Sequence, residues 1–598
     1  MRFLFLLFIP LIFSCNNATV SEVIHSKNNI YLNHNDSVSY VGKETCKQCH
    51  FDIYNSFMET GMGKSFDLAT KSKSVLDNNN NPLIYDEIKN LYYQPIWKKD
   101  SLYLLEFRLK KGDTTHKLLQ KIDFVIGSGQ HTNSHLFSIN GYLHQAPYTF
   151  YTQKGESDLP PGYDDGKNSR FSREIGLECM SCHNAYPNHV ENSLNKYDFV
   201  PNGIDCERCH GSGESHVKEK RSGVFVDIEN EIDYSIVNPS KLDKELQFDV
   251  CRRCHLQGTS VLQNGKNWDD FKPGTPLSGT METYLPKYEN DESFIMASHV
   301  DRLQQSECYI EGGLTCISCH NPHKSVTTLS ENYFNNKCME CHSVCEEKTE
   351  NTDCISCHMP KSSSTDIPHV SITDHKISVP YPITDTVEKG KFLGLVCVNN
   401  STPSNISRAK AYLKHYESFD LNPVLLDSAK RFLDKCTEKE SFPYYLQYYY
   451  LLQDYKNIIK LSETYNLDEL SNVFTINVLG MSFFRIAEAY CHFNFSDKAY
   501  VYYLKSLEFS AENLDYQLKT SILELKMTKF ETAKNRLNNI IKLNPYFEKA
   551  HYNLGLIYLN IDKDLLEAKK CFEKAIFLNP DYKLALQNLE YINRNEKK

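Results

Sequence analysis

After residue 15 the sequence lacks any apolar run long enough to cross a membrane, since a spanning helix needs about 20 predominantly apolar residues. It also lacks a basic excess, because 66 Lys and Arg against 76 Asp and Glu give a net charge of −10. Nucleic acid is therefore not an expected partner. General disorder is excluded too, because 40% of the residues are hydrophobic and only 24% are charged. The 598 residues leave room for two to four domains.

The N-terminus has one positive residue, the apolar run FLFLLFIPLIF and then Ser14-Cys15. This order predicts an export signal over residues 1–15. It resembles a bacterial lipoprotein signal, in which Cys15 becomes the lipidated first residue; an ordinary signal peptide is the alternative. Residues 16–39 are polar and suit a tether. We expect an exported protein, periplasmic or at the outer membrane or cell surface, with membrane contact only through a lipid anchor at Cys15.

Fourteen of the 21 cysteines fall in seven copies of Cys-x-x-Cys-His, called here motif one to motif seven in chain order. Cysteines in an exported protein first suggest disulfides. This spacing instead is the attachment signature of c-type haem. Two thiols bond to the porphyrin, and the histidine binds its iron as the proximal ligand. Zinc is the competing interpretation, but zinc sites do not need a histidine after every second cysteine.

The sequence thus predicts seven covalent haem c groups. The attachment cysteines are Cys46, Cys49, Cys179, Cys182, Cys206, Cys209, Cys251, Cys254, Cys316, Cys319, Cys338, Cys341, Cys354 and Cys357. The proximal ligands are His50, His183, His210, His255, His320, His342 and His358. No disulfide connectivity among Cys308, Cys345 and Cys397 can be deduced, and Cys436, Cys491 and Cys571 are expected to be buried small hydrophobes.

The second axial ligand of each iron decides between carrying electrons and binding substrate. Outside the motifs, residues 100–380 contain ten histidines for seven irons. The candidate distal ligands are His131, His189, His216, His323, His369 and His375, with Met62 proposed for motif one because no histidine lies between His50 and His116. The alternatives are surface histidines and a packed core methionine.

His323 poses a separate question, because it stands three residues after His320 in GLTCISCHNPH. Three residues span at most about 10 Å. That reach is too short to pass around a porphyrin to the opposite face of the same iron. We therefore expect His323 to point away from the haem of His320 and toward a neighbouring haem.

The chain divides into two main parts. Residues 40–380 are expected to form a heptahaem cytochrome c domain with sparse regular structure and a β-rich insertion at about 82–150, where Asn140-Gly141 predicts a hairpin. Residues 400–598 repeat with a period of 34–35, which aligns Ala499, Ala533 and Ala568 and places an extra residue near Asp562–Asp564. This period resembles tetratricopeptide repeats, with a plain helical bundle as the alternative. The fold class is therefore mainly α, a haem-packed domain followed by an α-solenoid.

Several segments carry a family resemblance: YVGKETCKQCH, RFSREIGLECMSCHNAYPNH, NGIDCERCHGSGESH, GGLTCISCHNPH, DCISCHMPK and HVSITDH. They resemble multihaem cytochromes c of the tetrahaem cytochrome c and hydroxylamine oxidoreductase superfamily, here fused to tetratricopeptide repeats. The resemblance implies an electron carrier or an enzyme acting on small nitrogen or sulfur compounds. It also implies that His189, His216 and His323 match ligand positions best. The chain lacks Cys-x-x-Cys-Lys, which resembles the catalytic motif of pentahaem nitrite reductases.

These observations favour a multihaem electron carrier in which the repeats dock redox partner proteins. The alternative is a multihaem oxidoreductase with one open-coordination haem acting on a small nitrogen or sulfur compound. A repeat scaffold with purely structural haems is the third and weakest interpretation. Catalytic residues are not assigned.

Overall fold

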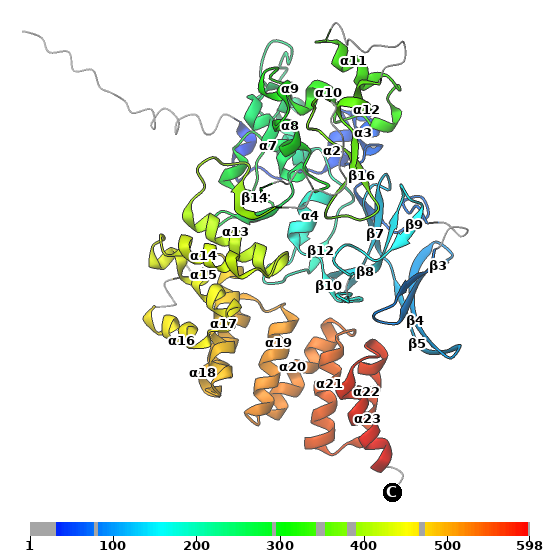
Figure 1. Ribbon diagram of the computed structural model, residues 1–598, viewed down its shortest axis with the longest axis vertical. Helices are drawn as coiled ribbons and strands as arrows, with labels where there is room; N and C mark the ends of the chain where they lie inside the picture. The colour runs from blue at the N-terminus through cyan, green and yellow to red at the C-terminus, as the bar shows by residue number, and fades with distance from the viewer. Residues whose placement is uncertain are drawn as a thin grey trace, which may run out of the picture.

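The computed structural model describes residues 31–76, 82–164, 166–289, 295–342, 353–379, 390–465, 470 and 473–595. The expected export signal, Cys15 and Cys345 lie outside these residues. Among the helices that the structure describes, none is both long and apolar enough to cross a membrane. Figure 1 shows the motif-bearing part at one end of the molecule, the β-rich part at its side, and the helical repeats at the other end.

The β-rich part consists of two antiparallel sheets. One has the order β2-β3-β4-β5, and the other has the order β1-β6-β7-β8-β10 with β9 paired to β8. Their strands are β1 (Phe66–Leu68), β2 (Ile84–Asp86), β3 (Leu91–Lys98), β4 (Ser101–Lys110), β5 (Asp113–Lys121), β6 (Phe124–Ile126), β7 (Thr132–Ile139), β8 (Tyr142–Tyr151), β9 (Glu156–Asp158) and β10 (Arg173–Glu174). The insertion is thus wider than the expected residues 82–150. Its core includes Tyr93, Val125 and Phe137.

The hairpin between β7 and β8 turns at Asn140-Gly141, where both residues have positive φ angles of 50° and 89°. A two-residue turn of this kind matches the twist of its flanking strands and favours Asn-Gly. The hairpin therefore forms at the position that the sequence predicts.

The motif-bearing part contains short helices joined by loops. They are α2 (Lys43–Lys47), α3 (Phe51–Met58), α4 (Leu177–His183), α5 (Glu207–His210), α6 (Glu214–Arg221), α7 (Lys244–His255), α8 (His299–Gln304), α9 (Glu307–Ile310), α10 (Cys316–Cys319), α11 (Tyr333–Met339) and α12 (Cys354–His358). Small two-stranded sheets pair β11 (Asn188–His189) with β12 (Tyr197–Phe199) and β15 (Lys361–Ser363) with β16 (Ser371–Thr373). The apolar clusters of this part are small, as in the group of Phe248, Val300 and Leu303.

A three-stranded sheet leads from the motif-bearing part to the repeats. It contains β13 (Thr259–Leu262), β14 (Met281–Tyr288) and β17 (Phe392–Cys397), with β14 in the middle. The first repeat helix packs on this sheet, where Thr259 Oγ1 and His415 Nδ1 are 2.7 Å apart. The two parts are thus joined by packing as well as by the chain.

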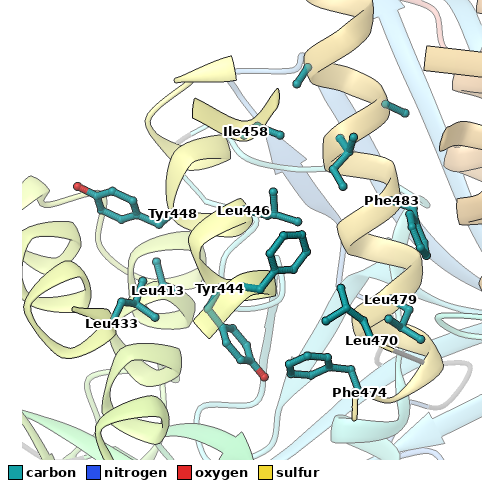
Figure 2. Close-up of a cluster of buried hydrophobic side chains, with 14 of the residues drawn as sticks. Leu413, Leu433, Tyr444, Leu446, Tyr448, Ile458, Leu470, Phe474, Leu479 and Phe483 are labelled. Atoms are coloured by element: carbon teal, nitrogen blue, oxygen red, sulfur yellow. The ribbon is translucent and has the colours of Figure 1, made fainter. Parts of the chain in front are cut away.

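The repeats are antiparallel helix pairs. Their helices are α13 (Asn405–Ser418), α14 (Pro423–Leu433), α15 (Glu438–Leu451), α16 (Tyr455–Thr464), α17 (Ile476–His492), α18 (Ser496–Phe509), α19 (Leu514–Lys526), α20 (Phe530–Leu543), α21 (Glu548–Ile557), α22 (Leu565–Leu578) and α23 (Lys583–Asn595). Ala499, Ala533 and Ala568 are fully buried, because only a small side chain lets paired helices approach closely. Figure 2 shows part of the apolar core of the repeats, which includes Leu446, Leu470 and Phe474.

The extra residue of the last full repeat is absorbed by a π-helical turn, η6 (Tyr558–Asp562), at the end of α21. Lys563 follows with a left-handed φ of 58°. A π-turn accommodates one extra residue at a single turn of a helix. The position agrees with the expected extra residue at 562–564.

The turns between successive repeats rest on the β-rich part and the loop that follows it. Glu512 accepts hydrogen bonds from the Tyr142 hydroxyl at 2.6 Å and from Lys196 at 3.0 Å. One repeat later, the Asn140 side-chain amide donates to the Leu543 carbonyl at 2.9 Å. At the next repeat, the Arg170 guanidinium donates to the Leu578 carbonyl at 2.7 Å, and Arg108 holds Asp581 at 2.7 and 2.9 Å.

Candidate haem-binding site

One continuous cavity of about 3070 Å³ runs through the motif-bearing part. All fourteen motif cysteines and all seven motif histidines line it. A pocket for one small ligand is typically about 300–1,000 Å³, so this cavity has the volume for several large groups. Strands β6–β8 of the β-rich part supply one wall, including Ser134, Leu136 and Thr149.

Each motif places its three side chains by one helical turn. The backbone N–H of His50 donates to the Cys46 carbonyl at 2.9 Å, and His210 donates to the Cys206 carbonyl at 3.0 Å. Such i to i+4 bonds put residues i, i+3 and i+4 on the same helix face. Both thiols and the histidine therefore face the cavity together, as covalent haem attachment requires.

Three motif histidines lie opposite a histidine from a distant part of the chain. The pairs are His50 with His216 at 6.4 Å between ring centres, His210 with His323 at 6.0 Å, and His320 with His375 at 6.3 Å. The ring planes within each pair differ by 9° to 26°. Two imidazoles on one metal, with metal–nitrogen bonds of about 2 Å on each side, have ring centres about 6 Å apart. Each pair thus has the spacing needed to hold one iron between its rings.

In several cavity histidines, one ring nitrogen is hydrogen-bonded to a backbone carbonyl. Nδ1 of His210 lies 2.8 Å from the Val237 carbonyl, and Nδ1 of His358 lies 2.8 Å from the Ser378 carbonyl. A carbonyl only accepts, so Nδ1 carries the hydrogen and the lone pair of Nε2 is left for a metal. Among the histidines that lie opposite a motif histidine, His375 makes the same contact: its Nδ1 lies 3.0 Å from the Thr373 carbonyl.

Burial lowers the pKa of His183, His320 and His323, which favours the neutral imidazole that ligation requires. Desolvation lowers the pKa of His183 and of His320 to about 4, with a further contribution from a neighbouring histidine in each case. The pKa of His323 is lowered for the same two reasons, with His50 as the neighbour. Neutral imidazole nitrogen is therefore available near pH 7.

His299 also belongs to the site, although the sequence does not predict it as a ligand. Its ring centre is 5.4 Å from that of His255 and 4.8 Å from that of His375. Its pKa is lowered to about 2, first by burial and then by the surrounding histidines. No local pattern in the sequence distinguishes His299, because helix α8 reaches motif four only through the tertiary fold.

Of the four remaining candidate ligands, two line the cavity and two lie outside its lining. His131 lines the cavity, with its Nδ1 3.0 Å from the side-chain amide nitrogen of Gln153. Met62 lines it too, but His216 is the side chain that lies opposite His50. His189 lies outside the cavity lining, edge-on to Tyr197 at 5.2 Å.

His369 is also outside the cavity lining. Its two ring nitrogens lie 2.8 Å from Glu156 and 2.9 Å from Asp158 on strand β9. Both nitrogens are thus engaged by carboxylates, which leaves neither free for a metal. The structure therefore does not bring His189 or His369 to a motif histidine.

The donor set fits covalent haem better than a bare metal ion. Within the part of the chain that the structure describes, no group of three or more His, Cys, Asp or Glu side chains is arranged to hold an ion directly. A structural zinc site needs about four such ligands in a tetrahedron. Paired thiols beside one histidine, repeated around a large cavity, match haem c.

Comparison with known proteins supports this assignment over a short segment. A family model described as cytochrome c554 and c-prime matches residues 153–211, which contain motifs two and three. The match supports covalently bound haem c in this region. The other five motifs lie outside it.

The repeats have relatives as well. Heat shock protein STI1 of Saccharomyces cerevisiae is 31% identical over 101 residues, which is 17% of this chain and 17% of the yeast protein. The chain therefore spans only about a sixth of the length of this curated relative.

Solved structures with similar helices include the first TPR of Spaghetti (RPAP3) bound to an HSP90 peptide, with 23% identity, coverage of 20% of this chain and 94% of that chain, and a TM-score of 0.19. The TPR protein YrrB has 16% identity, coverage of 30% and 99%, and a TM-score of 0.24. The helix pairs of this chain and their buried alanines independently define the repeat. The protein therefore combines tetratricopeptide repeats with a cytochrome c-like region.

Proposed function

We propose that this protein is an exported multihaem cytochrome c that carries electrons through seven covalently bound haems. The observation that carries the proposal is the single cavity lined by all fourteen thiols and all seven histidines of the motifs. Haem c, when bound, supplies a one-electron iron couple whose potential depends on its axial ligands and burial. The chain supplies attachment, axial ligands and an apolar enclosure.

The histidine pairs support low-spin centres at three motifs. In this assignment His216, His323 and His375 are the distal ligands for motifs one, three and five. His216 takes the place first considered for Met62, since a histidine at 6.4 Å from His50 has the spacing of a shared iron. Filled axial positions favour electron transfer over substrate binding.

The repeats are proposed to dock redox partner proteins, as stacked helix pairs offer an extended surface. The N-terminal sequence supports export and anchoring through a lipid at Cys15 in the periplasm or at the cell surface. Membrane contact is limited to that anchor in this proposal.

A second function has one observation in its favour. Among the described residues, the rings of His183, His342 and His358 face no second histidine ring. An iron held at one of these motifs with its sixth position open could bind a small nitrogen or sulfur compound. The protein would then be an oxidoreductase rather than a carrier.

The purified holoprotein tests both functions. Intact mass should show seven haems, and electron paramagnetic resonance should show mainly low-spin iron. A mass with fewer haems contradicts the heptahaem proposal. A high-spin component that shifts on addition of cyanide or nitrite supports the oxidoreductase, whereas a spectrum that neither ligand changes supports the carrier.

A further inference from the structure

A buried ion pair joins helix α8 to the segment that carries His375. The Arg302 guanidinium donates to both carboxylate oxygens of Asp374, from Nε at 2.9 Å and from Nη2 at 2.6 Å. Each of the two side chains is only 5% exposed. A bidentate arginine–carboxylate pair fixes the orientation of its partners as well as their distance. Helix α8 and Asp374 are therefore held in one geometry, although they are far apart in the sequence.

Asp374 stands between Thr373 and His375 in the chain, where the His375 ring is oriented. The Thr373 carbonyl lies 3.0 Å from Nδ1 of His375, which leaves the lone pair of Nε2 for a metal. The Asp374 carboxylate also accepts from the backbone N–H of Lys376 at 2.9 Å. This carboxylate therefore fixes the backbone that carries the ring.

Backbone hydrogen bonds tie the same segment to motif seven. The N–H of Asp374 donates to the Pro360 carbonyl at 3.0 Å, and strand β16 pairs with β15, which comes just after motif seven. The ring of His375, however, lies 6.3 Å from that of His320, which belongs to motif five. Bonds to motif seven do not by themselves set this distance, so a contact from another direction is needed.

Helix α8 supplies a contact from the side of motif four. Its residues Val300 and Leu303 pack against Phe248 of helix α7, which carries motif four. Arg302 lies between them in the sequence and is thus part of a helix that the core holds in place. The ion pair therefore fixes the position of the segment relative to α7.

The ion pair itself is not part of the cavity wall. Arg302 and Asp374 do not line the cavity, whereas His299, Thr373 and His375 do. The pair is also neutral as a whole, because its two charges are opposite. Its effect on an iron in the cavity must therefore be transmitted through the neighbouring residues that face the cavity.

We propose that Arg302 and Asp374 are positioning residues for His375. Their ion pair holds the His375 ring at the distance from His320 that two imidazoles on one iron require. The proposal rests on the proposed binding of haem at motif five. It adds the two residues that keep one distal ligand in place without touching the haem.

Arg302→Met with Asp374→Asn removes the ion pair and leaves no buried charge unpaired. The asparagine oxygen can still accept from the Lys376 N–H, so the change separates the segment from α8 and preserves its local turn. In the full-length holoprotein, intact mass should still show seven haems, because every motif is unchanged. Magnetic circular dichroism should show a new high-spin fraction of up to about one haem in seven, since His375 is no longer held at its iron. An unchanged low-spin spectrum would overturn the proposal.

The matched control is a buried ion pair of the β-rich part, formed by Glu106 and Arg170. Arg170 Nε donates to the Glu106 carboxylate at 2.8 Å, and the two side chains are 13% and 0% exposed. Arg170→Met with Glu106→Gln removes this pair in the same way. It should lower stability and leave the spin state unchanged. An equal high-spin fraction in the control would mean that general destabilisation, and not positioning, causes the effect.

His375→Ala identifies the iron on which the pair acts. On its own it should convert about one haem in seven to high-spin. Adding Arg302→Met and Asp374→Asn should raise this fraction no further, because both changes act on the same iron. A larger, additive fraction would contradict a role through His375.

The same variants separate this proposal from the proposed function. Fewer than seven haems in the unmodified protein would contradict the function itself, and an unchanged spectrum in His375→Ala would contradict the ligand assignment. If His375→Ala produces high-spin haem and the ion-pair variant does not, only the positioning role fails.

Arg302→Lys decides the question if the ion-pair variant binds fewer than seven haems. Lysine keeps the charge opposite Asp374 but lacks the bidentate fork that fixes its orientation. This variant should show a smaller high-spin fraction with all seven haems bound. A spectrum identical to that of the unmodified protein would contradict the proposal.

Discussion

At the scale of single residues, each motif and the ring that lies opposite its histidine are positioned by different physics. A cysteine pair and its histidine are placed by one helical turn, as the bond from His50 to Cys46 shows. The opposite ring comes from elsewhere in the chain, as His216 does for His50. The first arrangement is local and readable from spacing, while the second depends on the whole fold.

His323 provides the clearest test of an opposite ligand. His323→Ala should leave the haem count unchanged, because all motif cysteines remain. If seven haems are bound as proposed, about one in seven should become high-spin, since an iron held by His210 would lose its second imidazole. Magnetic circular dichroism and intact mass measure the two effects.

His189→Ala is the matched control, because His189 also follows a motif closely yet lies outside the cavity lining. It should change neither spin state nor haem count. A high-spin fraction in the His189 variant, or none in the His323 variant, would contradict the assignment.

The candidate ligands also show which contacts the sequence can predict and which it cannot. Spacing alone predicted that His323 cannot serve the iron of His320, and the structure places its ring 6.0 Å from that of His210. Spacing also suggested Met62 for motif one, because it is the nearest suitable side chain in sequence. The structure instead brings His216 from helix α6 to that position, and no local pattern contains this contact.

Lys410 gives a pH dependence of stability at the residue scale. Burial lowers its pKa to about 8, and its ammonium donates to the Leu262 carbonyl. The unfolded chain binds this proton more tightly, with a pKa of 10.5. The contribution of Lys410 to the free energy of unfolding is therefore greatest above pH 10.5 and is lost as pH falls from 10.5 to about 8.

Lys410→Met should remove that pH dependence. Relative to the variant, the native protein should gain about 1 kcal/mol between pH 8 and 10, a value reduced for the partial exposure of the side chain. Denaturant unfolding at several pH values measures it. Lys410→Arg, which stays charged throughout, should also flatten the profile, and an unaltered slope in both variants would refute the argument.

At the scale of elements, turns and repeat spacings were predictable because they are set by neighbours in sequence. The hairpin at Asn140-Gly141 and the extra residue absorbed near Lys563 both follow from local backbone requirements. The limits of the insertion were less readable, because β1 and β10 join its second sheet from outside residues 82–150.

A substitution at Gly141 measures how much the hairpin turn and its contact with Tyr197 contribute to stability. A Cβ at Gly141 would lie 2.8 Å from the Tyr197 carbonyl, in addition to the strain of a φ of 89°. Gly141→Ala should therefore destabilise the protein by about 2–3 kcal/mol, more than the strain of about 1 kcal/mol expected for φ alone. Thermal unfolding of the holoprotein measures the change.

Gly112→Ala is the matched control. Gly112 has nearly the same φ, 91°, and no atom within 4 Å of an added Cβ. It should show only the smaller loss due to backbone strain. Equal losses at both positions would mean that the contact with Tyr197 contributes nothing.

At the scale of the whole molecule, the repeats hold the β-rich part through hydrogen bonds at the turns between successive repeats. Equivalent carbonyls of successive repeats, those of Leu543 and Leu578, accept hydrogen bonds from Asn140 and Arg170. Strands β7 and β8, which flank Asn140, also line the cavity. The position of the repeats is therefore coupled to one wall of the cavity that the motifs line.

Asp581→Arg tests whether these contacts hold the repeats to the β-rich part. It places a second cation against Arg108 in place of the bidentate ion pair at 2.7 and 2.9 Å. The change should weaken docking of the last repeat by about 1–2 kcal/mol and speed amide hydrogen exchange in α22 and α23. Glu573→Arg, the same charge change at an exposed position of α22, is the control and should not affect exchange. Adding Arg108→Glu to Asp581→Arg should slow exchange again. If exchange in the double variant stays as fast as in Asp581→Arg alone, this ion pair does not hold the repeats to the β-rich part.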